Sequence, residues 1–237
     1  MDKIKVIVFD LDDTLVATTL CNNRCRKHAL ERVLTLLPGV DVTRAGAIEN
    51  TLYKSFGWAR LQDIWRGLAI ELGADVPSED ELVTIQRKFE QEFTKNLHLF
   101  PTVEYTLKSL TDNSSVDVGI ISDGDAGWQW RKMKTVGIDR FFDPEKVIIT
   151  IQSDLASSKP STANFRRQQK LFAARPNECV YIGDKPWDVL AANTAGWMSV
   201  RTTQAQTNEN SLWTLPELQV LHPDRVINTL SEILELI

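Results

Sequence analysis

The stretch VIVFDLDDTL, residues 6–15, begins as an unbroken apolar run and then changes abruptly into acidic residues and a threonine. Its first part, Val6–Phe9, is short and uncharged, which predicts a strand buried on both faces, as in a parallel sheet. Three acids, Asp10, Asp12 and Asp13, follow at the end of that strand. Clustered carboxylates repel one another and resist desolvation, so they cost stability unless a positive charge lies among them. The stretch therefore predicts a strand that opens onto a cation-requiring site.

The second half of the chain alternates strand-like and helix-like patterns. Further strands are expected at residues 116–122, 146–150, 178–184 and 198–202. Helices are expected from Pro101 through Leu110 and at residues 128–136, 162–174, 188–196 and 225–237. Such alternation implies right-handed crossovers between parallel strands. The fold class is therefore predicted to be α/β, with a Rossmann-like parallel sheet sandwiched by helices.

A helical block separates the first strand from the others. Residues 19–96 place apolar side chains three or four positions apart and show little strand signal. We therefore expect an inserted α-helical cap domain over residues 17–99, and a core domain made of residues 1–16 and 100–237. Within the insertion, charged helix positions such as Arg26 are expected to be solvated.

Tryptophans at helical spacing in the insertion are expected to be core residues and not substrate contacts. Trp58 and Trp65 are the two examples.

Composition limits the class of protein. The 237 residues are 43% hydrophobic and 25% charged, with a formal net charge of -5. This balance is typical of a globular protein and argues against nucleic acid as a partner. The apolar stretch near the start is shorter than that of a signal peptide and leads straight into acids. No apolar run approaches the length of a membrane span. The three cysteines lack the spacing of a metal or redox motif, which favours reduced thiols and a cytoplasmic location.

The predicted strands end in residues that can bind ligands. Open parallel sheets gather their chemistry at the carboxyl ends of their strands, so these residues are expected to meet. They are Asp10, Asp12, Asp13 and Thr14 after the first strand, Ser122, Asp123 and Gly124 after the second, Lys159 after the third, and Asp184 and Asp188 after the fourth.

The direction of each side chain follows from backbone periodicity. In an extended segment Asp10, Asp12 and Thr14 share one side, while Asp13 points away and is expected to be solvated.

Four of the acids form a predicted metal site. Asp184 and Asp188 lie one helical turn apart if a helix begins between them, so both can reach one point together with Asp10 and Asp12. A group of four carboxylates needs a hard divalent cation. Mg²⁺ fits best, because it prefers oxygen ligands and is commonly shared with a phosphate.

These residues also carry a family resemblance. DxDxT occurs at residues 10–14, a hydrophobic strand ends in Ser122, Lys159 precedes Pro160, and GDxxxD occurs at residues 183–188. In this order and spacing the four motifs resemble the haloacid dehalogenase superfamily, specifically its phosphatases with an inserted helical cap. The resemblance covers most of the predicted core. It implies a magnesium-dependent enzyme that hydrolyses small phosphomonoesters.

The resemblance implies a role for each acid. Asp10 would attack phosphorus and form an aspartyl-phosphate. Asp12 would protonate the leaving group and then activate water, and its pKa is expected to be raised by its anionic neighbours. Mg²⁺ would be held by Asp10, the backbone carbonyl of Asp12 and Asp184. Asp188 would orient a metal-bound water or Lys159, or serve only as a charge at a helix N-terminus.

The remaining motif residues are implied to bind phosphate. Ser122 and the amides after it, with Lys159, would bind the phosphoryl oxygens. Asp123 and Gly124 would shape the phosphate loop through their backbones, and Thr14 shares the side of the strand that faces the phosphate.

Alternative activities remain open. A sugar phosphomutase would share the chemistry as far as the aspartyl-phosphate, and a dehalogenase would need neither a metal nor the second acid. A phospho-acceptor signalling module also places acids at the end of a first strand. The expected partner is a small phosphorylated metabolite, such as a sugar phosphate, a nucleotide or a phosphoglycolate-like compound. The protein is expected to be a monomer or a homodimer without nucleic-acid or membrane partners.

Overall fold

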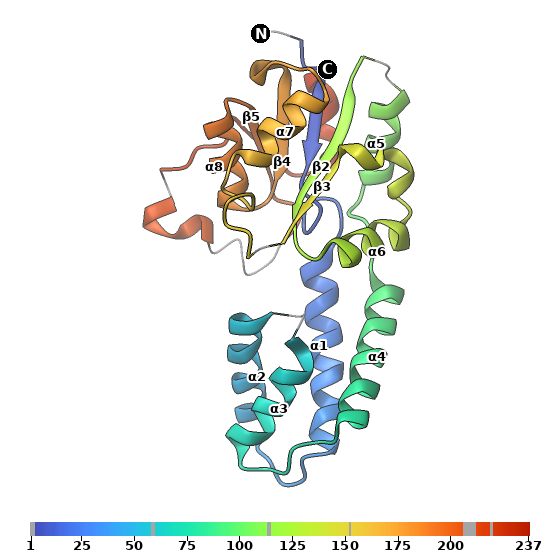
Figure 1. Ribbon diagram of the computed structural model, residues 1–237, viewed down its shortest axis with the longest axis vertical. Coiled ribbons are helices and arrows are strands. Elements are labelled where there is room, and N and C mark those ends of the chain that lie inside the picture. The colour runs from blue at the N-terminus through green and yellow to red at the C-terminus, as the bar shows by residue number, and fades with distance from the viewer. Residues whose placement is uncertain (1–2, 58–59, 113–114, 152, 206–211, 219) are drawn as a thin grey trace. The chain divides into compact units, whose positions relative to one another are not determined.

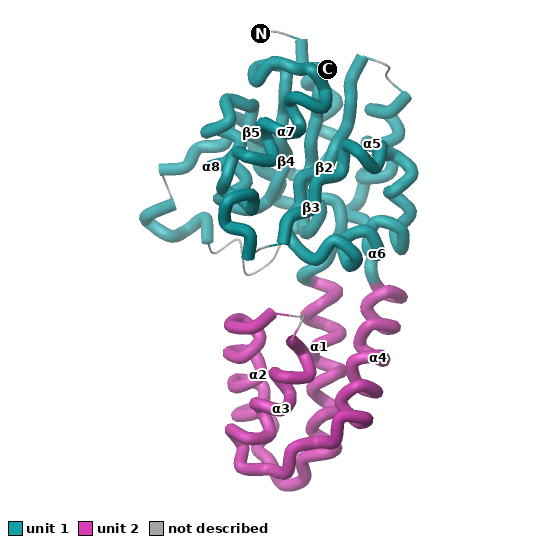
Figure 2. The backbone as a smooth tube through the Cα atoms, in the orientation of Figure 1, with its two compact units in different colours: residues 1–19, 97–237 teal, residues 20–96 magenta. Residues whose placement is uncertain are grey.

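The computed structural model describes residues 3–57, 60–112, 115–151, 153–205, 212–218 and 220–237. It divides the chain into two compact units (Figure 2). Unit 1 contains residues 1–19 and 97–237, and unit 2 contains residues 20–96. Trp58 lies outside the described residues.

Unit 1 is built on a six-stranded sheet in the order β3-β2-β1-β4-β5-β6, with every neighbouring pair parallel. β1 is fully buried at the middle of the sheet, as its uninterrupted apolar sequence predicts. Backbone pairing sets Phe9 beside Ile120 of β2 and Ile182 of β4, so β1 and β4 end nearly level with each other and β2 continues three residues beyond Ile120 at the same edge of the sheet. The strands are β1 Val6–Phe9, β2 Asp117–Asp123, β3 Val147–Thr150, β4 Cys179–Gly183, β5 Met198–Thr202 and β6 Arg225–Ile227.

Two layers of helices enclose this sheet (Figure 1). α5 (Val103–Asp112) and α6 (Ala126–Val136) lie on one face, and α7 (Ala163–Leu171) and α8 (Pro186–Ala195) lie on the other. On the second face Phe165 of α7 packs with its ring centroid 4.7 Å from that of Tyr181. The predicted α/β class with a Rossmann-like parallel sheet between helices is confirmed. None of the helices that the structure describes is long and apolar enough to cross a membrane.

Unit 2 is helical. It contains most of α1 (Thr18–Thr35), together with α2 (Val42–Phe56), α3 (Leu61–Leu72) and α4 (Glu79–Asn96). Trp65 is 1% exposed in its core, as expected for a tryptophan at helical spacing. Arg26 is 9% exposed, so its predicted solvation is wrong. Its guanidinium is buried because Glu49 of α2 supplies a matching carboxylate.

The C-terminal segment differs from the predicted helix at 225–237. Arg225–Ile227 instead form the edge strand β6 beside β5, and Leu230–Leu236 form a 3-10 helix. Edge pairing gives the backbone of β5 hydrogen-bond partners, which a helix here would leave unpaired. Periodicity alone could not reveal a strand of three residues.

Candidate active site

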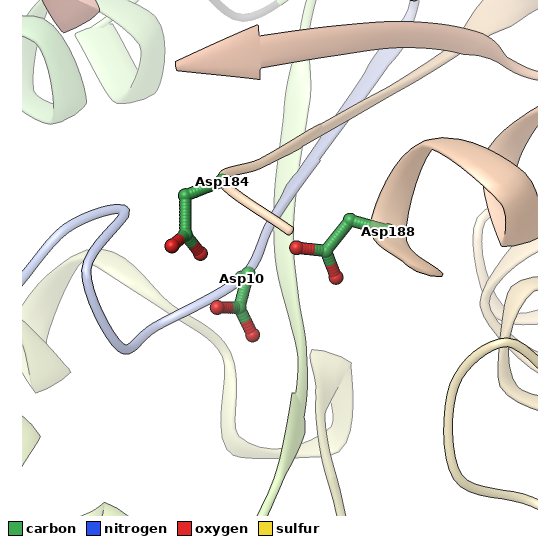
Figure 3. Close-up of side chains that lie close together, drawn as sticks. All are labelled: Asp10, Asp184 and Asp188. Atoms are coloured by element: carbon green, nitrogen blue, oxygen red, sulfur yellow. The ribbon is translucent and has the colours of Figure 1, made fainter. Parts of the chain in front are cut away.

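Three acids converge at the carboxyl end of the sheet. Asp10 follows β1, Asp184 follows β4, and Asp188 lies in the first turn of α8. One oxygen from each carboxylate lies within 4.8 Å of the others, and Figure 3 shows the three side chains turned toward a common space. All three are at most 5% exposed. The strand order explains this meeting, because β1 and β4 are neighbours in the sheet.

Lys159 supplies a positive charge to this cluster. Its ammonium Nζ lies 2.7 Å from Asp10 Oδ1 and 2.7 Å from Asp188 Oδ1, and it donates to Tyr181 Oη at 3.1 Å. Burial favours its neutral form, but the two carboxylates outweigh that effect and raise the pKa of Lys159. Burial also raises the pKa of Asp10, to about 7, although Lys159 opposes the shift. Lys185 Nζ lies 3.0 Å from Asp184 Oδ2, and the two lysines together only partly compensate the acids.

The surroundings of Asp184 indicate that the cluster lacks positive charge. Burial raises the pKa of Asp184 well above its ordinary value; the charge of Lys185 opposes this shift, and those of Asp188 and Asp10 add to it. Its Oδ1 is buried and has no hydrogen-bond partner among the described residues. Such an orphaned oxygen is costly, and the donor set here consists of carboxylate oxygens, which hard cations prefer. The residues present therefore fit a divalent cation such as Mg²⁺.

Close packing beside Asp188 supports this arrangement. A Cβ at Gly183 would collide with the Asp188 carboxylate. Asp188 Oδ2 also accepts a hydrogen bond from the Lys185 amide at 2.9 Å. Glycine before Asp184 thus lets the first turn of α8 approach the end of β4.

The Asp12 carboxylate is not a member of this three-acid cluster. Its Oδ2 accepts from Gln129 Nε2 at 2.8 Å, and its Oδ1 accepts from Thr18 Oγ1 and pairs with Lys132 Nζ. Burial would raise its pKa, but the charge and hydrogen bond of Lys132, with the hydrogen bonds from Thr18 and Gln129, lower it overall. The predicted upward shift of the Asp12 pKa is therefore wrong, because the nearest charge is a cation and not another acid.

Asp13 also differs from expectation. It is 2% exposed rather than solvated. Its backbone has a φ of 61°, which turns its side chain toward the first turn of α1, where it accepts from Thr19 N at 2.9 Å and from Thr19 Oγ1. Asp13 therefore stabilises the N-terminus of α1 by hydrogen bonding.

The last two residues of β2 and the glycine that follows them lie close to the acids. Ser122 is 1% exposed and its Oγ accepts a hydrogen bond from Gln129 at 2.9 Å. Asp123 Oδ2 accepts from the Lys159 amide at 3.0 Å, which joins the ends of two predicted motifs. The Gly124 amide donates to Thr150 O at 2.7 Å, so this amide is already engaged in the sheet.

A pocket of about 370 Å³ opens beside these residues. At its rim Leu155 is 84% exposed and Trp187 is 36% exposed. Thr14 is not among its lining residues, although Thr14 Oγ1 is buried without a hydrogen-bond partner in the described part of the chain. The lining residues are Asp10, Asp12, Asp123, Leu155, Ser158, Lys159, Lys185 and Trp187.

Comparison with known proteins agrees with this geometry. Residues 4–196 match the model of the haloacid dehalogenase-like hydrolases. The chain belongs to that family. It is 31% identical over 205 residues to a glyceraldehyde 3-phosphate phosphatase of Pyrococcus furiosus, covering 84% of this chain and 81% of the relative. It is 24% identical over 249 residues to the pyrophosphatase PpaX of Bacillus mycoides, covering 99% and 97%.

Solved structures of haloacid dehalogenase-like proteins share the fold. A "predicted phosphoglycolate phosphatase" from Haemophilus somnus 129PT has a TM-score of 0.66 and 24% identity, with 99% of this chain and 98% of that chain covered. A 2-haloacid dehalogenase from Pseudomonas syringae pv. tomato has a TM-score of 0.63 and 23% identity, with 98% and 97% covered. The expectation of an enzyme of this hydrolase superfamily is confirmed, and phosphatase is the class that the relatives' names give.

Proposed function

We propose that this haloacid dehalogenase-like hydrolase is a magnesium-dependent phosphatase that cleaves small phosphomonoesters through an aspartyl-phosphate on Asp10. The observation that carries the proposal is the position of Asp10. Its carboxylate lies in the pocket, 2.7 Å from the Lys159 ammonium and within 4.8 Å of oxygens of Asp184 and Asp188. A buried carboxylate that lines a pocket beside a buried ammonium is suited to nucleophilic attack.

The first step transfers the phosphoryl group to Asp10. A carboxylate oxygen forms a bond to phosphorus while the ester oxygen leaves with its bonding electrons. Lys159 reduces the repulsion between the anionic nucleophile and the phosphate. Its ammonium can also bind the phosphoryl oxygens as negative charge develops on them. Ser122, whose hydroxyl lies beside the same site, is proposed to donate to those oxygens.

Asp12 is proposed to move the protons. It gives a proton to the departing oxygen, and the resulting carboxylate then takes one from the water that attacks the aspartyl-phosphate. Its place on the pocket wall, two residues beyond the nucleophile, supports this role.

Asp10, Asp184 and the Asp12 carbonyl are proposed to hold the Mg²⁺ ion. When bound, the ion supplies positive charge that offsets the repulsion between carboxylate and phosphate. The unpartnered Asp184 Oδ1 supports this assignment. Both oxygens of Asp188 already accept hydrogen bonds or pair with Lys159, which favours a role in orienting that lysine.

Unit 2 is proposed to serve as the cap. It is inserted between β1 and β2, and closure of such an insertion would exclude bulk water and select the leaving group. The three cysteines are buried free thiols, which supports the proposed cytoplasmic location.

A phosphate-release assay tests this function. The substrates are glyceraldehyde 3-phosphate, pyrophosphate, phosphoglycolate, sugar phosphates and nucleotides, each with Mg²⁺ and with EDTA. We expect phosphate release from at least one small monoester, with loss of activity in EDTA. Transfer of phosphate between two positions of a sugar without release would favour the mutase, and absence of both reactions would contradict the proposal.

A matched pair of variants separates the nucleophile from a general effect of charge. Asp10→Asn removes the attacking charge and is expected to abolish turnover, while Asp112→Asn alters an exposed aspartate paired with Lys108 and is expected to keep it. Full activity in Asp10→Asn would refute the nucleophile.

A further inference from the structure

Two polar side chains of α6 are buried at the site without belonging to any of the four motifs. Gln129 is 2% exposed and Lys132 is 4% exposed. They lie three residues apart in the helix, so they project from the same face. Both contact the Asp12 carboxylate: Gln129 Nε2 donates to Oδ2 at 2.8 Å, and Lys132 Nζ pairs with Oδ1.

Burial of a lysine is costly unless its charge is paired. Among the described residues, the ion-pair partner of Lys132 is Asp12, whose side chain is 29% exposed and lines the pocket. The pair is therefore oriented, with the ammonium inside the protein and the carboxylate at the pocket wall. Such an arrangement holds the carboxylate in place from behind.

Gln129 connects Asp12 to Ser122 near the end of β2. The same amide nitrogen that donates to Asp12 lies 2.9 Å from Ser122 Oγ and 3.1 Å from Asp123 O. Gly124 leaves the space for this amide: its φ is 152°, and a Cβ there would lie 2.8 Å from Gln129 Nε2. The loop after β2 is thus shaped around Gln129.

We propose that Gln129 and Lys132 are positioning residues that hold the Asp12 carboxyl group in line with the leaving-group oxygen; this inference rests on the proposed phosphatase function. In the step concerned, the O–H bond of protonated Asp12 breaks as a new O–H bond forms on the ester oxygen, and the bond from that oxygen to phosphorus breaks. Asp12 is left as a carboxylate, which Lys132 stabilises. A misplaced acid would slow this step most for a leaving group that needs a proton, and least for one that departs as a stable anion.

Leaving-group dependence separates this role from a merely structural one. Phenyl phosphate expels a basic phenolate that needs a proton, whereas p-nitrophenyl phosphate has a similar shape and expels a stable anion. We expect Gln129→Leu and Lys132→Met each to lower kcat/KM for phenyl phosphate about 100-fold, and for p-nitrophenyl phosphate by less than about 10-fold. Equal losses on the two substrates would overturn the proposal.

Two further variants complete the experiment. Lys134→Met removes an exposed lysine from the same helix and is expected to leave both substrates unaffected. Gln129→Asn keeps the amide but shortens its reach, so it must show the same selective loss if Gln129→Leu fails to fold. Failure of the wild-type enzyme to cleave either ester would refute the phosphatase itself, whereas parallel losses in the variants would refute only the positioning role.

Discussion

Lys159 Nζ lies 2.7 Å from Asp10 Oδ1, although 149 positions separate the two residues in the chain. The same ammonium lies 2.7 Å from Asp188. The lysine therefore holds together the end of β1 and the start of α8. It offsets part of the repulsion in the cluster, and the orphaned Asp184 oxygen leaves a need for further positive charge.

Removal of this lysine is expected to make the protein depend more strongly on Mg²⁺. Lys159→Met leaves Asp10 and Asp188 without their buried partner, which costs about 3 kcal/mol of the free energy of unfolding in EDTA. Added Mg²⁺ binds the freed carboxylates of the folded state and should restore part of that loss. Urea unfolding with and without Mg²⁺ measures both effects. Lys108→Met, at an exposed ion pair, serves as the control, and the idea fails if Mg²⁺ stabilises the two variants equally.

Glu178 should make stability depend on pH. Its carboxylate accepts from Arg175 Nη2 at 2.9 Å, pairs with Lys5 Nζ at 2.7 Å and accepts from Arg175 N at 2.8 Å. The Arg175 and Lys5 side chains, followed by the Arg175 amide, lower the pKa of Glu178 from 4.5 to about 2. Because the folded-state pKa is the lower one, this stabilisation is complete above the unfolded pKa and is lost as the pH falls toward 2.

The variant Glu178→Gln tests the direction of this pH dependence. Its free energy of unfolding should fall below that of the wild type at neutral pH, and the difference should shrink as the pH is lowered toward 2. Chemical denaturation across pH measures it, with the exposed Glu31→Gln as the matched control. A difference that grows in acid would contradict the assignment.

A buried ion pair in unit 2 predicts strong non-additivity. Arg26 bonds Glu49 through Nε at 3.1 Å and Nη2 at 2.7 Å, and its guanidinium lies 3.4 Å from the centroid of the Tyr53 ring. Arg26→Met leaves the buried Glu49 carboxylate without its cationic partner and should lower the free energy of unfolding by about 3 kcal/mol. The double variant Arg26→Met with Glu49→Leu should recover most of that loss. Urea unfolding of the two single variants and the double variant gives the coupling energy, and simple addition of the single losses would count against it.

The sequence was sufficient to predict much of the site because strand ends in a parallel sheet converge by topology. Asp10 and Asp184 each directly follow a short apolar run, and their strands, β1 and β4, are neighbours in the sheet, which brings the two acids together. Lys159 lies nine residues after the end of β3, but at the same edge of the sheet. The alternation of strands and helices likewise predicted the α/β class.

Features that depend on tertiary contacts could not be predicted from the sequence. Gln129 and Lys132 look like ordinary polar positions of an amphipathic helix, and only their burial against Asp12 reveals them. That contact also reverses the direction of the Asp12 pKa shift. The signal available in the sequence was the spacing of Gln129 and Lys132, which places two polar side chains on one face of the helix after the Ser122 strand. Asp13 was misjudged because a φ of 61° breaks the alternation of an extended segment.

Covalent trapping on Asp10 tests the central claim most directly. Asp12→Asn removes the base that the second step requires, so the phosphorylated enzyme should accumulate after mixing with p-nitrophenyl phosphate and Mg²⁺. Borohydride reduces an acyl phosphate to an alcohol, and peptide mass spectrometry then locates the modified residue. The account predicts modification at position 10 in this variant and none in the double variant Asp10→Asn with Asp12→Asn. Modification of another residue, or release of phosphate with no modified residue at any time during turnover, would contradict it.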